Sequence, residues 1–267
     1  MPIRSLLVLV LCWQTLAPAL AGQTCDPKQV DAATTARAMD LAYQSRQALD
    51  ASGAQVALIA RVGQDLSKYG LRYSHMAWVW RDHPQGRWLV VHELNNCATA
   101  QSALFNEGLG NFFLDNMFAF ETRILIPTPE TQARAAALLA SPQALAYHFP
   151  HYNMLAFAYS TTYQNSNQWV LETYAALFHG NSRDNNVRSN AQTWLKANGY
   201  QADTVNIPTA TRLGARLFRA NIAFDDHPFG RRMAGQIDTV TVESVLRFIK
   251  QREPTSREII LHAQPKG

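Results

Sequence analysis

The sequence has few cysteines, a low density of charge and no long run of lysine or arginine. Charged residues make up 16% of the 267 residues and the net charge is +4, spread along the chain. Because nucleic-acid surfaces concentrate basic residues on one face or element, this pattern argues against a nucleic-acid partner. The three cysteines allow at most one disulfide within the chain. With 47% hydrophobic residues, 13 glycines and 12 prolines, the composition is that of an ordinary globular domain.

Long hydrophobic runs are absent except at the N-terminus. Arg4 precedes an apolar stretch over 6–16, and the small residues Ala19 and Ala21 follow it. This order is typical of a cleaved secretory signal, so we expect residues 1–21 to be removed and the protein to be periplasmic or secreted. The alternative is an uncleaved anchor, but the apolar run is too short to span a bilayer stably. No other segment is apolar enough, so we expect a protein that is not integral to the membrane.

Export decides how the cysteines are interpreted. Cys12 leaves with the signal, and Cys25 and Cys97 remain. In an oxidising compartment, the simplest prediction for two cysteines is one disulfide bond. The alternative is that Cys97 is a reactive thiol, because the segment after residue 94 is compatible with a strand that turns into a helix, where a thiolate is stabilised.

The hydrophobic pattern predicts an α+β fold with helices around a small, mostly antiparallel sheet. Helical spacing and capping signals predict helices over 31–52, 129–140, 167–178, 186–196, 209–219 and 242–250, and a helix pair over 97–118 broken around 108–110. Apolar and β-branched runs predict strands over 55–63, 72–81, 87–94, 119–126 and 152–160. We expect one domain over 22–267, with a helical C-terminal extension from about 200, and see no internal repeat.

Two histidines lie on the predicted hairpin of strands 72–81 and 87–94. If its loop holds an even number of residues, Asp82 pairs with Arg87 and paired residue numbers sum to 169. His75 and His92 then point to the same face as diagonal neighbours, because residues two apart on a strand share a face. An odd loop would place them on opposite faces.

Ser166 stands at or beside the first turn of the predicted helix 167–178. Covalent hydrolysis needs a nucleophile, a base within reach and a group that orients the base. Ser166 would supply the hydroxyl, His75 the base and His92 the orienting group, and the helix N-terminus would offer N–H groups to an oxyanion. The competing interpretation is that Ser166 only caps the helix, the commonest role of serine at this place.

The order of these parts resembles the permuted branch of the NlpC-type papain-like superfamily. Residues 165–170, Asn-Ser-Asn-Gln-Trp-Val, correspond to the Asn-Cys-Glu-His-Phe-Val motif of the lecithin:retinol acyltransferase-like enzymes, and residues 70–75 match the Gly-x-x-Tyr-Ser-His signature of that branch. More closely, nearly the whole mature chain resembles the bacterial domain-of-unknown-function family 2145. This resemblance implies a papain-like fold in permuted order, but it brings no established activity.

Serine at position 166 departs from the cysteine of the enzymes that the chain resembles. A helix N-terminus and an adjacent histidine lower the pKa of a thiol, whereas a hydroxyl depends on base catalysis in the transition state. Two hypotheses follow. The first is an exported hydrolase or acyltransferase of amide or ester bonds, with cell-wall peptides as one substrate class. The second is an inactive periplasmic binding or assembly module, which would be favoured if His75 and Ser166 were too far apart for a hydrogen bond, directly or through one water.

Other candidate groups have simpler interpretations. Several histidines and aspartates could be metal ligands, but their spacing matches no zinc signature, so we expect no metal and no cofactor; they are His148, His151, His179, Asp225, Asp226 and His227. Arg61 and Asp65 either line a cleft or form a surface ion pair. The aromatic residues are expected mainly in the core, with one or two at a substrate groove; they are Tyr73, Trp78, Trp80, Trp88 and Trp169.

Overall fold

A computed structural model describes residues 30–97, 99–115, 117–179 and 186–263, without the side chains of 216–218. The expected signal segment, Cys25 and the C-terminal residues 264–267 lie outside the described residues. Among the residues that are described, no helix is both long enough and apolar enough to span a bilayer.

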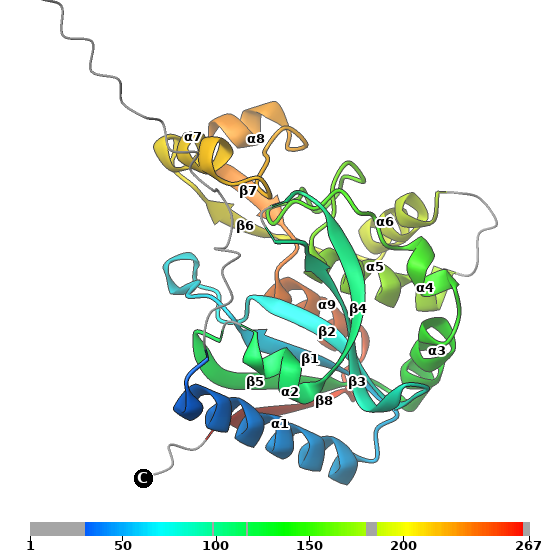
Figure 1. Ribbon diagram of the computed structural model, residues 1–267. Coiled ribbons are helices and arrows are strands. Elements are labelled where there is room, and N and C mark those ends of the chain that lie inside the picture. The colour runs from blue at the N-terminus through cyan, green and yellow to red at the C-terminus, as the bar shows by residue number, and fades with distance from the viewer. Residues whose placement is uncertain (1–29, 98, 116, 180–185, 264–267) are drawn as a thin grey trace, which may run out of the picture.

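The fold is α+β, with a six-stranded antiparallel sheet in the order β4-β3-β2-β1-β5-β8 (Figure 1). Its strands are β1 (Val56–Val62), β2 (His75–His83), β3 (Gly86–Asn95), β4 (Ser102–Gly108), β5 (Ala119–Ile126) and β8 (Arg257–His262). The predicted antiparallel sheet surrounded by helices is therefore confirmed.

Helices cover both faces of this sheet, which explains why β1 is buried along its whole length. One apolar cluster joins α1 (Ala32–Ser52) and α2 (Leu109–Leu114) to the sheet. A second cluster on the opposite face joins α3 (Pro129–Leu139), α5 (Ser166–His179), α6 (Val187–Ala197) and α9 (Val242–Arg252). The short α4 (Gln143–Ala146) and the 3₁₀ turn η1 (Ser67–Tyr69) lie in connections. Along β1, β2 and β5, alternate apolar residues enter the two clusters, as the period of two requires.

A small lobe stands above one end of the sheet (Figure 1). It contains β6 (Asp203–Asn206), α7 (Thr209–Phe218), α8 (Phe229–Met233) and β7 (Gln236–Thr239), with β6 and β7 paired antiparallel. The chain then returns to the body, where α9 joins the core and β8 pairs with β5. The segment after Gly199 is thus built from strands as well as helices and completes the main sheet.

Two predicted elements are wrong. The first part of the predicted helix pair over 97–118 is strand β4, whose pairing with β3 overrides its local preference. The predicted strand over 152–160 is a series of turns with isolated bridges from Tyr152 and Phe157. Both segments border the candidate site, so these corrections change which residues reach it.

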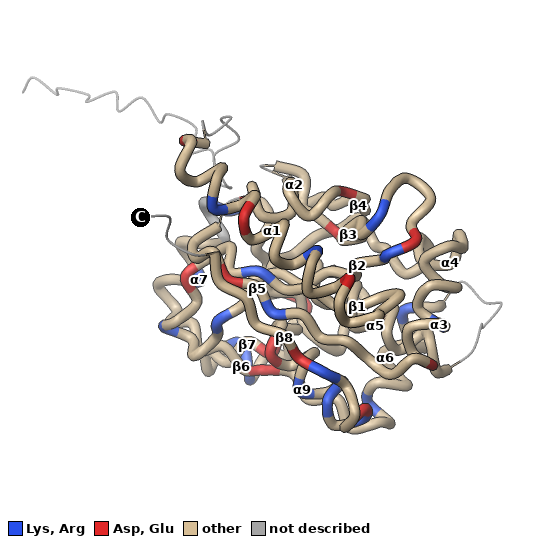
Figure 2. Tube along the Cα trace, turned by 90° about the horizontal axis from the view of Figure 1, so that it is seen from below, with Lys and Arg blue, Asp and Glu red and all other residues tan. Residues whose placement is uncertain are grey.

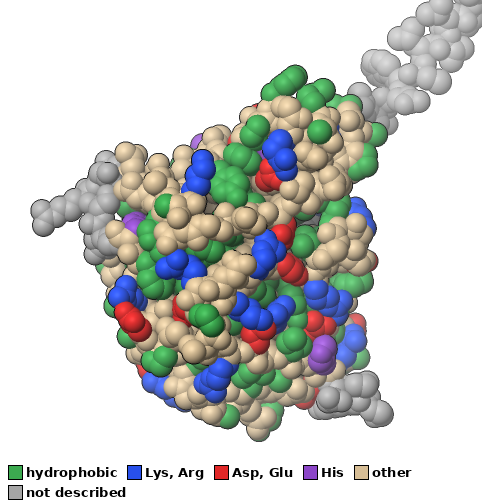
Figure 3. All heavy atoms as spheres, turned by 180° about the vertical axis from the view of Figure 1, so that it is seen from behind, with side chains coloured by type: hydrophobic (Ala, Val, Ile, Leu, Met, Phe, Trp, Pro, Cys, Tyr) green, Lys and Arg blue, Asp and Glu red, His purple; other side chains and the backbone are tan. Residues whose placement is uncertain are grey.

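Basic and acidic side chains are interspersed over the surface of the molecule. Along the chain in Figure 2 they are interspersed. The face seen in Figure 3 also mixes both signs with apolar side chains. This surface matches the modest net charge of the sequence.

Candidate functional site

The β2–β3 hairpin aims His75 and His92 the same way. Asp82 pairs with Arg87 and Trp78 with Val91, so paired numbers sum to 169 as the even loop requires. His75 Nε2 lies 2.8 Å from His92 Nδ1, a hydrogen bond between two buried rings. Of the two registers that the sequence left open, the structure has the even one, which places the two histidines on one face.

Glu107 on β4 adds a carboxylate behind His92. Its Oε1 lies 3.0 Å from His92 Nε2, although the ring N–H is not aimed straight at the oxygen. The carboxylate favours a proton on His92 Nε2, which leaves His92 Nδ1 as an acceptor for His75 Nε2–H. In this arrangement His75 Nδ1 carries the lone pair that can take a proton. The sequence prediction missed Glu107 because its segment was assigned to a helix.

Burial keeps both histidines neutral. Desolvation lowers the pKa of His75 well below 6.5, and the nearby Arg61 and His92 act in the same direction. Burial also lowers the pKa of His92, against the opposing effect of Glu107. A neutral His75 at neutral pH is the form that acts as a base.

Ser166 is the first residue of α5, and Asn165 is its cap. Asn165 Oδ1 accepts a hydrogen bond of 2.8 Å from the Gln168 N–H, so the cap interpretation of Ser166 is wrong. The N–H groups of Ser166 and Asn167 have no acceptor among the described residues. Such free N–H groups at a helix start can stabilise an oxyanion.

Asn167 fastens the start of α5 to the backbone on both sides of His75. Its Oδ1 accepts the Met76 N–H at 2.9 Å, and its Nδ2 lies 3.5 Å from the Ser74 carbonyl oxygen. The ladder between β2 and β3 ends at Trp78 and Val91. Beyond that pair, the Asn167 amide bonds to the β2 backbone groups that a neighbouring strand would otherwise reach. The residue after Ser166 is thereby held against the residues before and after His75.

The His75 and Ser166 side chains nevertheless belong to different sheet faces. The His75 ring packs near Phe112 of α2 at a centroid distance of 6.0 Å, whereas α5 packs on the side of Met76 and Trp78. Among the described residues no hydrogen bond joins Ser166 Oγ to His75. The Ser166 and His75 side chains can therefore interact only through a substrate or a water, or after one of them rotates. This would take place at the end of the sheet where β2 and β3 are no longer paired.

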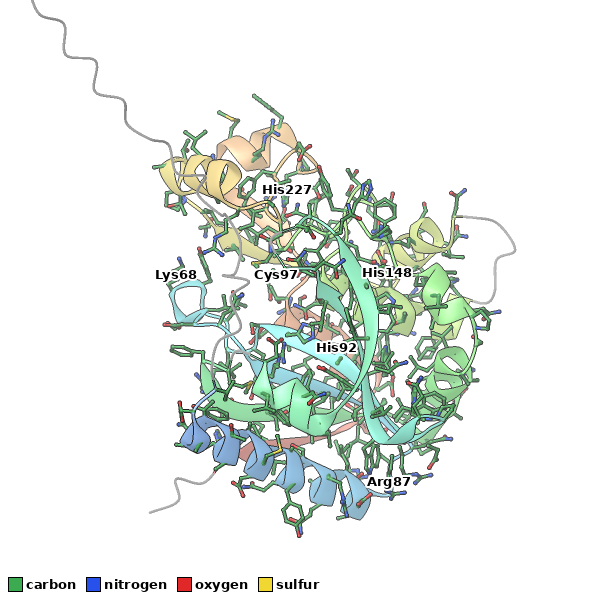
Figure 4. All side chains as sticks on the ribbon, viewed as in Figure 1. Lys68, Arg87, His92, Cys97, His148 and His227 are labelled. Carbon is green, nitrogen blue, oxygen red and sulfur yellow. The ribbon has the colours of Figure 1, made fainter. Side chains whose placement is uncertain are left out.

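Both residues line one pocket of about 1150 Å³. Arg61, Tyr73, Cys97 and Asn167 are among its other lining residues. In Figure 4, His92 lies within the body, and Lys68 and Cys97 lie toward the lobe. The pocket therefore joins the histidine side of the sheet to the start of α5.

A second group of buried polar residues lies on the α5 face. Burial raises the pKa of Glu93 to about 8, against weaker effects of Ser102 and Arg188. Neither Glu93 oxygen has a hydrogen bond of good geometry among the described residues. Burial and Glu93 raise the pKa of Tyr152 to about 12, and a contact from the Ser166 hydroxyl opposes them. The sequence prediction missed Glu93 and Tyr152 because only their packing in the fold makes them unusual.

The remaining candidates lie where the fold gives them other roles. Arg61 is buried and pairs with Asp115, so a surface ion pair with Asp65 is wrong, and both Arg61 and Asp65 line the pocket. Cys97 lies in the turn after β3, with no helix start beside it. The predicted bond to Cys25 stays a prediction, because Cys25 is not described.

The metal-ligand candidates do not come together. In the described part of the chain, no three histidine, cysteine, aspartate or glutamate side chains are grouped to hold a metal. His148 instead contacts the Ser102 hydroxyl at 3.0 Å, and His227 pairs with Asp226 at 2.9 Å. Tyr73 lines the pocket, while Trp78, Trp88 and Trp169 are core residues.

A family model described as an uncharacterized protein conserved in bacteria (DUF2145) matches residues 48–249. The chain belongs to the DUF2145 family. The match spans the hairpin histidines, the Glu107 strand and the Ser166 helix, so the whole candidate site lies in the family region. No curated protein and no solved structure matches the chain.

The pKa of Glu93 predicts a pH dependence of stability. Because the folded-state pKa of about 8 exceeds the ordinary value of 4.5, Glu93 favours folding below pH 4.5. That contribution is lost as the pH rises toward 8, with a slope of about 1.4 kcal/mol per pH unit. Glu93→Gln should remove this slope in urea unfolding measured from pH 5 to 8. The control is the exposed Glu130→Gln, which should keep it, and equal slopes in both variants would contradict the burial argument.

Proposed function

We propose that this protein is an exported hydrolase or acyltransferase of amide or ester bonds, with a permuted papain-like site in which serine is the nucleophile. The supporting observation is the His75–His92 hydrogen bond of 2.8 Å, backed by Glu107, in the pocket that Ser166 also lines. Export, the Cys25–Cys97 disulfide and cell-wall peptides as a substrate class are parts of the proposal that rest on the sequence.

In the proposed reaction, Ser166 Oγ attacks the carbonyl carbon and its proton passes to His75 Nδ1, directly or through one water. The His92 and Glu107 side chains stabilise the imidazolium that forms. The carbonyl oxygen becomes an oxyanion beside the N–H groups of Ser166 and Asn167. The bond to the leaving group breaks, and that group takes the proton from His75. Water or an acceptor alcohol or amine then attacks the acyl-serine ester, loses its proton to His75, and Ser166 regains its proton.

A second candidate function is a binding module that keeps the pocket without catalysis. It is supported by the missing hydrogen bond between His75 and Ser166, and by the contact of the Ser166 hydroxyl with Tyr152. In this alternative, the buried histidines order the end of the sheet. The two functions differ in whether removal of the Ser166 hydroxyl alters turnover or only ligand affinity.

Replacement of the nucleophile separates these functions. Ser166→Ala should lower hydrolysis of simple esters and cell-wall peptides by at least 10³-fold, the usual scale for loss of a nucleophile that acts with its base. The exposed Ser189→Ala on α6 is the matched control and should retain full turnover. Ser166→Cys should restore activity in part, because a helix start favours a thiolate. Equal turnover of the wild type and Ser166→Ala would exclude the proposed mechanism.

The fall of kcat/KM toward low pH reports the protonation of His75. Since burial holds the pKa of His75 well below 6.5, the neutral base persists through pH 6.5, and kcat/KM should stay level there and fall only at lower pH. The measurement is kcat/KM for a non-ionising ester between pH 4.5 and 8. A loss of half the activity at pH 6.5 would indicate an unshifted histidine and contradict the burial argument.

A further inference from the structure

The pocket has two sides of different chemistry. One part of its lining consists of His75 on β2 and of Ser166 and Asn167 at the start of α5. The other side is formed by a third apolar cluster, separate from the two clusters that flank the main sheet. We call it the apolar wall; its members are Tyr69, Leu71, Leu155, Val205, Ile207, Ala215, Ile222, Phe224 and Ile237.

The side chains of the apolar wall line the pocket and are not buried only against one another. All its members except Ile237 line the pocket, although Val205, Ile207 and Phe224 are also buried. A cluster of this kind offers apolar surface to a ligand, and the packing of the lobe holds the side chains of the cluster in position. Burial of apolar ligand atoms against such a surface is the main source of affinity in small-molecule pockets.

Three separate segments build this wall. Tyr69 and Leu71 come from the loop before β2, and Leu155 comes from the turns before α5. The remaining members belong to the lobe and its connections. The wall is therefore continuous with the two connections that lead into His75 and Ser166.

Charged side chains also line this pocket, and one of them, Lys68, lies beside a member of the apolar wall. Lys68 lies over the Tyr69 ring at 4.6 Å, and the Arg61 guanidinium pairs with Asp115 on the α2 side. Asp65 and Arg219 also line the pocket. A ligand can thus place a carbonyl near Ser166 and extend an uncharged group along the wall.

We infer that the pocket binds an apolar acyl group, the part of an ester or amide on the carbonyl side of the scissile bond. This chemistry has two sources, the hydrocarbon chain of a fatty acyl ester and the apolar side chain of an N-acylated amino acid ester. The position of the scissile bond rests on the proposed function, whereas affinity for the apolar group does not. A charged acyl group would lose hydration against the apolar side chains of the wall.

The first experiment measures turnover of two ester series by the full mature protein. One series has fatty acyl chains of two to ten carbons, and the other has N-acetyl glycine, alanine, leucine and phenylalanine. The value of kcat/KM should rise about threefold to fourfold with each of the first added methylenes. The series with the steeper rise identifies the source, and a preference for the acetyl and glycine esters would overturn the inference.

Ala215→Leu tests the wall itself, since it adds side-chain volume on α7 beside the pocket. Its matched control is Ala210→Leu, an exposed residue of the same helix that does not line the pocket. Ala215→Leu should reduce kcat/KM for the longest apolar substrates at least tenfold and leave the shortest nearly unchanged. The control should follow the wild type, and identical profiles for the two variants would contradict the assignment of the wall.

Binding without chemistry separates this inference from the proposed function. In Ser166→Ala protein, a fluorescent medium-chain fatty acid and N-acetyl-leucine amide should bind saturably, and Ala215→Leu should weaken the preferred probe at least fivefold. Binding together with absent wild-type turnover would retain the apolar site and reject the hydrolase. Failure of both probes to bind would reject the apolar site, whatever the turnover.

Discussion

The register of the β2–β3 hairpin is the constraint on which the site depends. It brings His75 and His92 to one face and into a hydrogen bond of 2.8 Å. A shift of one residue would reverse the face of every side chain on a strand. Beyond Trp78 and Val91 the ladder ends, and Asn167 bonds to the backbone groups beside His75. The same hairpin therefore orients the histidines and positions the helix that begins with Ser166.

The molecule keeps ionisable groups buried on both faces of this hairpin. Glu107 supports His92 on the α2 side, whereas Glu93 is without a well-aligned partner among the described residues on the α5 side. Buried polar groups without partners cost stability, so they are uncommon outside functional sites. Their neighbours His75, Tyr152 and Ser166 line the pocket between the lobe, the sheet end and α5. That pocket brings the His75 imidazole, the Ser166 hydroxyl, the N–H groups at the start of α5 and the apolar wall together.

Sequence reasoning predicted the parts of the site that depend on local pattern. The α+β class, the hairpin and the helix after Ser166 follow from hydrophobic periodicity and turn chemistry, whereas these signals leave the hairpin register open between an even and an odd loop. Glu107 escaped prediction because its segment was assigned to a helix, whereas Glu93 and Tyr152 are unusual only through their packing in the fold. The apolar wall could not be predicted, because it joins the loop before β2 to β6 and β7, two short strands without a local signal. The cap at Asn165 was equally hidden, since serine and asparagine both suit that position.

Covalent labelling most directly tests the proposed activation of Ser166 by His75. A fluorophosphonate should attach to Ser166 in the wild-type protein, as mapped by mass spectrometry of its peptides. The His75→Ala variant, shown to be folded by circular dichroism, should lose this label because no base accepts the hydroxyl proton. Absence of label at Ser166 in the wild type, or equal labelling in both proteins, would contradict the account.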